Sequence, residues 1–113
     1  MRKPPPLLQD AYDLVLDLYR LVPAFPKAQR HVLGQRIEQA ALDLLFGIDA
    51  ANDKDGRVSA IDRASRGLDE LRLLVRLATD LRFVSIDRHE RLALRLDAIG
   101  RQLGGWKKWA TSA

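Results

Sequence analysis

The spacing of apolar residues constrains this chain more than any other sequence feature. Over most of its length they recur at alternating steps of three and four, which places them on one face of an α-helix. One such series is Leu33, Ile37, Ala40, Leu44 and Ile48. No proline occurs after Pro26, so nothing interrupts the later series. We therefore expect an all-α protein.

The pattern predicts four helices, at residues 7–22, 27–51, 58–84 and 86–110. Pro23 and Pro26 separate the first two, and a polar turn at residues 52–56 with Gly56 as the turn residue separates the second from the third. We expect Ser59 to cap the third helix and Ser85 to cap the fourth, with Asp87 in its first turn. Four amphipathic helices with short connections are typical of an antiparallel up-down bundle, here one domain spanning residues 1–113.

Each predicted helix contributes one apolar stripe to the expected core. The stripes are Leu8, Ala11, Val15, Leu18 and Val22; Leu33, Ile37, Ala40, Leu44 and Ile48; Ile61, Ala64, Leu68, Leu71, Val75 and Ala78; and Leu92, Leu96, Ile99, Leu103 and Trp106. Two helices carry further leucines off these stripes, namely Leu14, Leu16 and Leu21 in the first and Leu73, Leu74 and Leu77 in the third. A second apolar face predicts a subunit interface.

Several classes of function have no support in the sequence. There is no cysteine, and no glutamate is followed by histidine three residues later, as a bundle di-metal site requires. Asp53 and Asp55 resemble part of a calcium loop, but Ala51 falls where the first carboxylate ligand belongs. We find no phosphate loop, catalytic constellation, secretory signal or membrane span, and we expect a cytoplasmic protein with no enzymatic activity, metal or cofactor.

Basic residues are the most informative charged feature. The net charge is +4, all of it in residues 50–113, and 14 of the 19 basic residues are arginine, which forms bidentate contacts with phosphate. Two readings stay open at this point. The basic side chains form a surface that follows a phosphate backbone, or they form a solvated face with intrahelical ion pairs such as Asp62–Arg66 and Asp97–Arg101.

The second predicted helix and the C-terminal segment resemble a known family. Its motifs here are Phe25-Pro26-Lys27, Arg30, Leu33-Gly34-Gln35-Arg36-Ile37-Glu38, Ala41-Leu42-Asp43-Leu44-Leu45, Arg57-Val58-Ser59, Gly67-Leu68, Leu71-Arg72 with Arg76, and Ile99-Gly100-Arg101-Gln102-Leu103-Gly104-Gly105-Trp106. Over residues 12–109 the chain is similar to the accessory variability determinant (Avd) of diversity-generating retroelements. That family lies within a superfamily of bacterial four-helix-bundle proteins that includes proteins encoded in ribosomal RNA intervening sequences.

The resemblance implies a ring of five antiparallel bundles without enzymatic activity. It implies binding to the retroelement's reverse transcriptase and to nucleic acid, either the template-repeat RNA or an RNA/DNA hybrid, in support of mutagenic cDNA synthesis. The alternative is a structural bundle of the intervening-sequence type with no specific nucleic-acid binding.

The candidate contact residues come from the family motif and from the basic surface. Arg72 and Arg76 occupy charged motif positions, and Arg36 is either another contact or part of an intersubunit ion pair. The remaining candidates are Arg66, Arg95, Arg101, Lys107 and Lys108. We expect Trp106 to serve packing rather than base stacking.

Overall fold

Six helical segments make up the computed structural model, which describes residues 6–112. They are α1 (Pro6–Leu21), the 3-10 turn η1 (Val22–Ala24), α2 (Lys27–Arg30), α3 (Leu33–Ala50), α4 (Arg57–Asp80) and α5 (Ile86–Thr111). These residues contain no strand, so the predictions of an all-α chain and of four principal helices are confirmed. The sequence places Pro4, Pro5 and Pro6 before the first predicted helix. α1 begins at Pro6 itself, and Pro4 and Pro5 lie outside the described residues.

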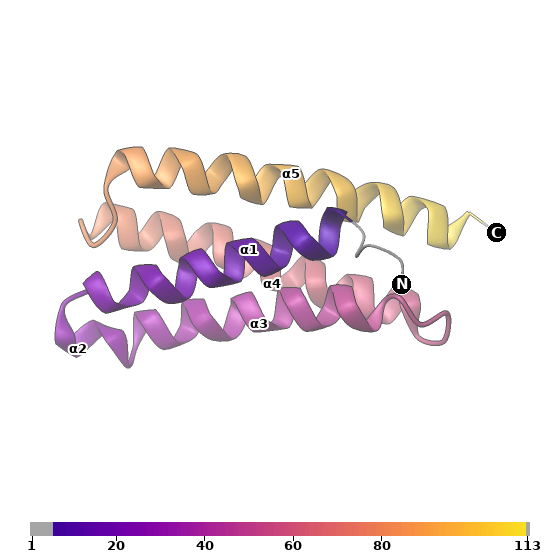
Figure 1. The fold of residues 1–113 in the computed structure, drawn as a ribbon, viewed down its shortest axis with the longest axis horizontal. Helices are drawn as coiled ribbons and strands as arrows, with labels where there is room; N and C mark the ends of the chain where they lie inside the picture. The colour runs from indigo at the N-terminus through magenta and orange to yellow at the C-terminus, as the bar shows by residue number, and fades with distance from the viewer. Residues whose placement is uncertain (1–5, 113) are drawn as a thin grey trace.

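The four long helices lie side by side, and the chain reverses its course at each connection (Figure 1). α1 packs against α3 and α5, and α4 packs against the same two helices. α1 and α4 therefore occupy opposite corners of the arrangement. In Figure 1, α2 and the connection between α4 and α5 lie at one end, and the connection between α3 and α4 lies at the other.

The predicted stripes form the core with few exceptions. All the stripe residues of α3 and α4 are buried, as are Leu92, Leu96, Ile99 and Leu103 of α5, whereas Leu8 and Trp106 are only partly buried. The prediction that Leu14 and Leu21 lie on a second apolar face is wrong, because both are buried in the core. α1 contacts two neighbouring helices, so a wide arc of its surface is covered. Leu16, Leu73 and Leu77 remain exposed.

α3 and α4 approach each other closely at two glycines. A methyl group on Gly47 would lie 2.8 Å from the backbone nitrogen of Ala64, and one on Gly67 would lie 2.9 Å from the carbonyl oxygen of Ala40. Both distances are shorter than real side chains allow, so only glycine permits this packing. A late residue of α3 thus meets an early residue of α4, and an earlier residue of α3 meets a later one of α4.

The start of α4 differs from the prediction. The helix begins at Arg57, and its N-terminal cap residue is Gly56 in the left-handed conformation (φ 73°), so the prediction that Ser59 caps it is wrong. Gly56 reverses the chain three residues before Ser59, a conformation that glycine adopts at little cost. The cap at α5 is confirmed: Ser85 Oγ accepts a hydrogen bond from the Arg88 amide at 3.1 Å, and Asp87 lies in the first turn.

The predicted continuous helix at residues 27–51 is also wrong. It breaks at His31 and Val32, where Val32 has a non-helical backbone (φ −112°, ψ −85°). Two tertiary contacts accompany the break. Phe25 is buried and packs against Phe83 in a tilted arrangement with ring centroids 5.6 Å apart, and Arg30 Nε donates a hydrogen bond to the Phe25 carbonyl at 3.1 Å. The short α2 therefore folds back on the buried Phe25 before α3 begins.

The third predicted helix ends four residues early, at Asp80 instead of Val84. Arg82 adopts a left-handed conformation (φ 66°), the Arg82 amide donates to the Thr79 carbonyl at 2.9 Å, and the Phe83 amide donates to the Ala78 carbonyl at 2.8 Å. This is a Schellman C-cap with arginine at the position where glycine is usual. The absence of that glycine is why the sequence did not indicate the helix end.

The glycine contact between α3 and α4 predicts that two glycine-to-alanine substitutions destabilise the protein, although alanine usually stabilises a helix relative to glycine. Gly47→Ala and Gly67→Ala should each lower the free energy of unfolding by about 1–3 kcal/mol, because the new methyl group meets backbone atoms. Gly104→Ala is the matched control: it also lies within a helix but has open space around it, so it should raise stability by up to about 1 kcal/mol. Urea unfolding followed by circular dichroism measures the free energy of unfolding of all three variants. Equal effects at the three sites would contradict the close contact between α3 and α4.

The C-cap of α4 gives a second stability prediction. Arg82→Gly should stabilise the protein by up to about 1 kcal/mol, because glycine adopts the left-handed conformation without the steric cost that arginine incurs. Gly56→Ala should destabilise the protein by a similar amount, because alanine adopts the left-handed conformation (φ 73°) only at a steric cost. A methyl group there would contact no other atom, so the effect reports the backbone conformation alone. Thermal unfolding of the two variants beside the parent protein tests the pair.

Candidate nucleic-acid interface

All the ion pairs among the described residues join different helices. Two connect α3 with α4 (Arg36–Glu70 at 3.5 Å and Arg63–Asp43 at 3.4 Å), two connect α4 with α5 (Arg72–Asp97 at 3.2 Å and Lys107–Asp62 at 2.7 Å), and Arg95–Asp17 connects α5 with α1. The expected intrahelical pairs Asp62–Arg66 and Asp97–Arg101 do not form. Both aspartates face the seam between α4 and α5 and pair across it instead.

These pairs divide the eight candidate contact residues into two groups. Arg36, Arg72, Arg95 and Lys107 each contact a carboxylate on a neighbouring helix. Arg66, Arg76, Arg101 and Lys108 are exposed and contact no carboxylate within the part of the chain that the structure describes. Only the second group presents charge that is not already matched locally.

The two arginines of the family motif fall into different groups. Arg72 lies in a groove between α4 and α5, where Nη1 contacts Asp97 and Nη2 approaches the Leu96 carbonyl at 3.5 Å. A methyl group on Gly100 would lie 2.6 Å from Arg72 Nη2, so this glycine makes room for the guanidinium. Arg76 lies one turn further along α4 and is exposed. Arg72 thus holds two helices together, whereas Arg76 is available to a partner.

The two unpaired candidate cations of α5 share one face. Arg101 and Lys108 are seven residues apart and both are exposed, so they lie two turns from each other on the outer side of the helix. Leu94, seven residues before Arg101, continues the same face and is 70% exposed. On α4, Arg66 and Leu73 are likewise seven residues apart and exposed.

The structure adds an aromatic group that was not among the candidates. Trp109 is 61% exposed, and the Arg57 guanidinium lies over its ring at 5.2 Å from the centroid. Both residues line a surface hollow of about 530 Å³ together with Lys54 and small residues of α4 and α5. The signal in the sequence was the run Lys107-Lys108-Trp109, since basic and aromatic residues alternate in sites for single-stranded nucleic acid.

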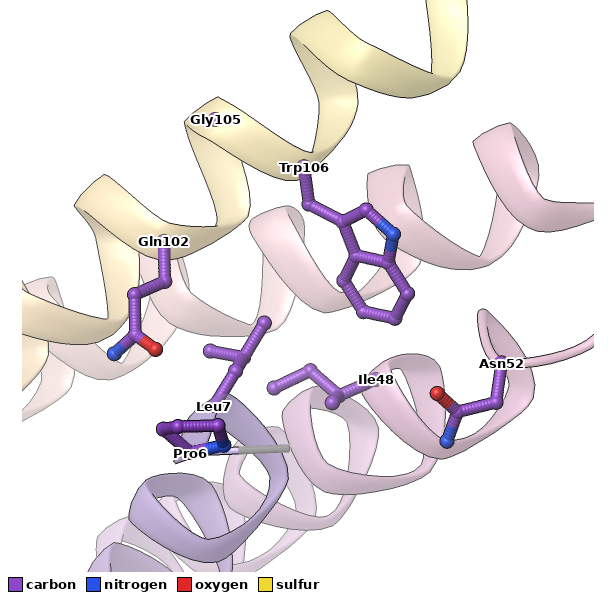
Figure 2. Close-up of a pocket in the computed structure, with 7 residues that line it drawn as sticks. All are labelled: Pro6, Leu7, Ile48, Asn52, Gln102, Gly105 and Trp106. Carbon is purple, nitrogen blue, oxygen red and sulfur yellow. The ribbon is translucent and has the colours of Figure 1, made fainter. Parts of the chain in front are cut away.

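Trp106 has a packing role, as the sequence predicted. It is partly buried against the core and borders an apolar pocket of about 430 Å³ at the end of the bundle where α1 begins. Figure 2 shows the side chains of Leu7, Ile48 and Trp106 gathered in this pocket, with Gln102 and Asn52 to either side. Gln102 is itself engaged, because its Nε2 donates to Asp10 at 3.0 Å.

Two further features bear on the classes of function. Within residues 6–112, no helix has an apolar stretch long enough to span a bilayer. In the same range, no three histidine, aspartate or glutamate side chains converge in a way that could hold a metal ion. Asp53 serves the turn instead, since its carboxylate accepts a hydrogen bond from the Asp55 amide at 3.1 Å.

Comparison with known families identifies the family of this bundle. A family model described as bAvd-like matches residues 7–110, from the first turn of α1 to the last turn of α5. The chain belongs to the bAvd-like family. Among curated proteins, none matches it. The resemblance in the sequence motifs is thereby confirmed, and because the match includes every helix, the bAvd-like unit is the whole bundle.

Two apolar stripes on the surface of this bAvd-like protein are left uncovered by residues 6–112. Tyr12, Leu16 and Tyr19 follow each other at steps of four and three along α1 and are 38–51% exposed. Leu73 and Leu77 are one turn apart on α4 and are 67% and 46% exposed. We call these the α1 stripe and the α4 stripe. Because α1 and α4 occupy opposite corners and the stripe residues are exposed, the two stripes face away from each other.

Proposed function

We propose that this bAvd-like chain is a non-enzymatic accessory protein of a diversity-generating retroelement. It binds RNA and the element's reverse transcriptase and supports mutagenic cDNA synthesis. The observation that carries the proposal is the family match over residues 7–110. The excess of unpaired cations on α4 and α5 supports the RNA-binding part, because phosphate contacts supply most of the affinity in sequence-independent binding.

The division of the cations predicts which ones bind RNA. Arg101→Gln/Lys108→Gln removes two unmatched charges from one face of α5. This variant should bind single-stranded RNA more weakly, and the slope of log affinity against log salt should become shallower by about 1.4, or roughly 0.7 per lost phosphate contact. Fluorescence anisotropy of a labelled oligoribonucleotide between roughly 50 and 300 mM salt measures both quantities.

The matched control removes a paired cation together with its carboxylate. Lys107→Gln/Asp62→Asn leaves the net charge unchanged and should leave RNA affinity and slope as in the parent. If the control loses as much binding as Arg101→Gln/Lys108→Gln, the assignment of contacts is wrong. If the parent protein shows no salt-dependent RNA binding, the result favours the alternative of a structural bundle of the intervening-sequence type. Association with the reverse transcriptase is then the next test.

We further propose that antiparallel up-down bundles of this chain assemble into a ring of five. The two exposed apolar stripes support a ring, because two different surfaces that face apart can join head to tail, and such contacts close into rings when the rotation permits. A ring of five would carry a charge of about +20, which attracts RNA over long distances. In this arrangement the α1 stripe of one subunit packs on the α4 stripe of the next.

Mixing two interface variants tests the head-to-tail contact. Tyr12→Glu/Tyr19→Glu and Leu73→Glu/Leu77→Glu should each be monomeric, because each lacks one of the two surfaces. Their mixture should form a one-to-one dimer, since each variant supplies the surface that the other lacks. Native mass spectrometry measures the stoichiometry, and Leu94→Glu, which is exposed but lies on α5, should leave the ring intact. A mixture that stays monomeric would contradict this contact.

A further inference from the structure

We infer that Trp109 and Arg57 form a stacking platform for an unpaired base of single-stranded RNA. The inference rests on the proposed RNA-binding function and assigns it a specific contact. Trp109 lies near the C-terminal end of α5, and Arg57 is the first residue of α4. The platform therefore lies at the end of the bundle that contains the connection between α3 and α4 (Figure 1).

Arg57 is held in place independently of any ligand. Its Nε donates to the Ala51 carbonyl at 2.7 Å, and its Nη2 donates to the Asn52 carbonyl at 3.1 Å, so it satisfies backbone oxygens just after α3. The same guanidinium lies 5.2 Å from the centroid of the Trp109 ring. A fixed cation on an indole restricts the ring before a ligand arrives, which reduces the entropy lost on binding.

Much of the Trp109 side chain is nevertheless open to solvent. At 61% exposed, it leaves a large aromatic surface uncovered although Arg57 lies over the ring. A planar base can cover this surface, and stacking of a base on an aromatic side chain contributes about 1–3 kcal/mol. Only unpaired bases are accessible to such stacking, because the bases of an A-form duplex are stacked on one another.

The charges around the platform favour a nucleotide over an uncharged or cationic partner. Among the described residues, those lining the hollow include the cations Lys54 and Arg57 and no carboxylate. Asp53 and Asp55 are close in sequence but do not line it. Lys108, which is exposed and contacts no carboxylate among the described residues, precedes Trp109 directly. A base on Trp109 would thus have its phosphates near Lys54, and the volume of about 530 Å³ is within the range of small-molecule sites.

The test uses Trp109 as its own reporter. In a Trp106→Phe background, Trp109 is the only tryptophan, and its fluorescence should be quenched by single-stranded oligouridylate and much less by an RNA duplex of equal length. Trp109→Ala in the full chain should weaken binding to the single strand by about 5- to 150-fold. The salt slope should stay unchanged because indole carries no charge, and Trp109→Phe should retain most of the affinity.

The outcomes separate this inference from the proposed function. Parent-level RNA affinity in Trp109→Ala, or absent quenching while anisotropy reports binding, would overturn the platform and leave the RNA-binding function standing. No RNA binding by the parent would overturn both. If Trp109→Ala binds RNA normally but loses association with the reverse transcriptase, the surface is a protein contact and the inference is wrong. Circular dichroism melting controls for folding, which this exposed side chain should not affect.

Discussion

The close approach of α3 and α4 is the constraint on which the rest of the structure depends. Gly47 and Gly67 allow backbone atoms of the two helices to meet at distances that any side chain would prevent. Such contacts fix both the register of the helices and the rotation of each about its axis. The pairs Arg63–Asp43 and Arg36–Glu70 lie along this seam and are largely exposed, so they contribute little energy and follow the packing rather than direct it.

The rotation of α4 in turn decides which basic residues are available to a partner. With Gly67 against α3, Arg72 lies in the groove toward α5, where Asp97 neutralises it and Gly100 makes room for it. Arg76, one turn further along α4, and Arg66 contact no carboxylate within residues 6–112. Four of the eight candidate cations contact carboxylates on neighbouring helices, and the other four are exposed without such a contact among the described residues.

The sequence predicted the core well because core periodicity is a local property. It failed where a conformation or a partner depends on distant residues. The break before α3 accompanies the burial of Phe25 against Phe83, and these two residues are 58 positions apart in the chain. The end of α4 has an arginine, Arg82, in the left-handed conformation that glycine usually adopts. The ion pairs were missed for the same reason: rules for helix pairs four residues apart do not report which helix lies alongside. Trp109 required the fold as well, since its partner Arg57 lies at the start of another helix.

Arg57, at the turn between α3 and α4, has both a structural role and a proposed binding role. Gly56 ends the turn in a left-handed conformation, and Arg57 then reaches back to the carbonyls of Ala51 and Asn52. Because those hydrogen bonds go to backbone oxygens, they persist when the side chain of Trp109 changes. A substitution at Arg57 would disturb the turn and the platform together, whereas one at Trp109 removes the aromatic surface alone. The stacking contact can therefore be separated experimentally from the packing that supports it. The paired residues of the α4–α5 seam do not allow such a separation.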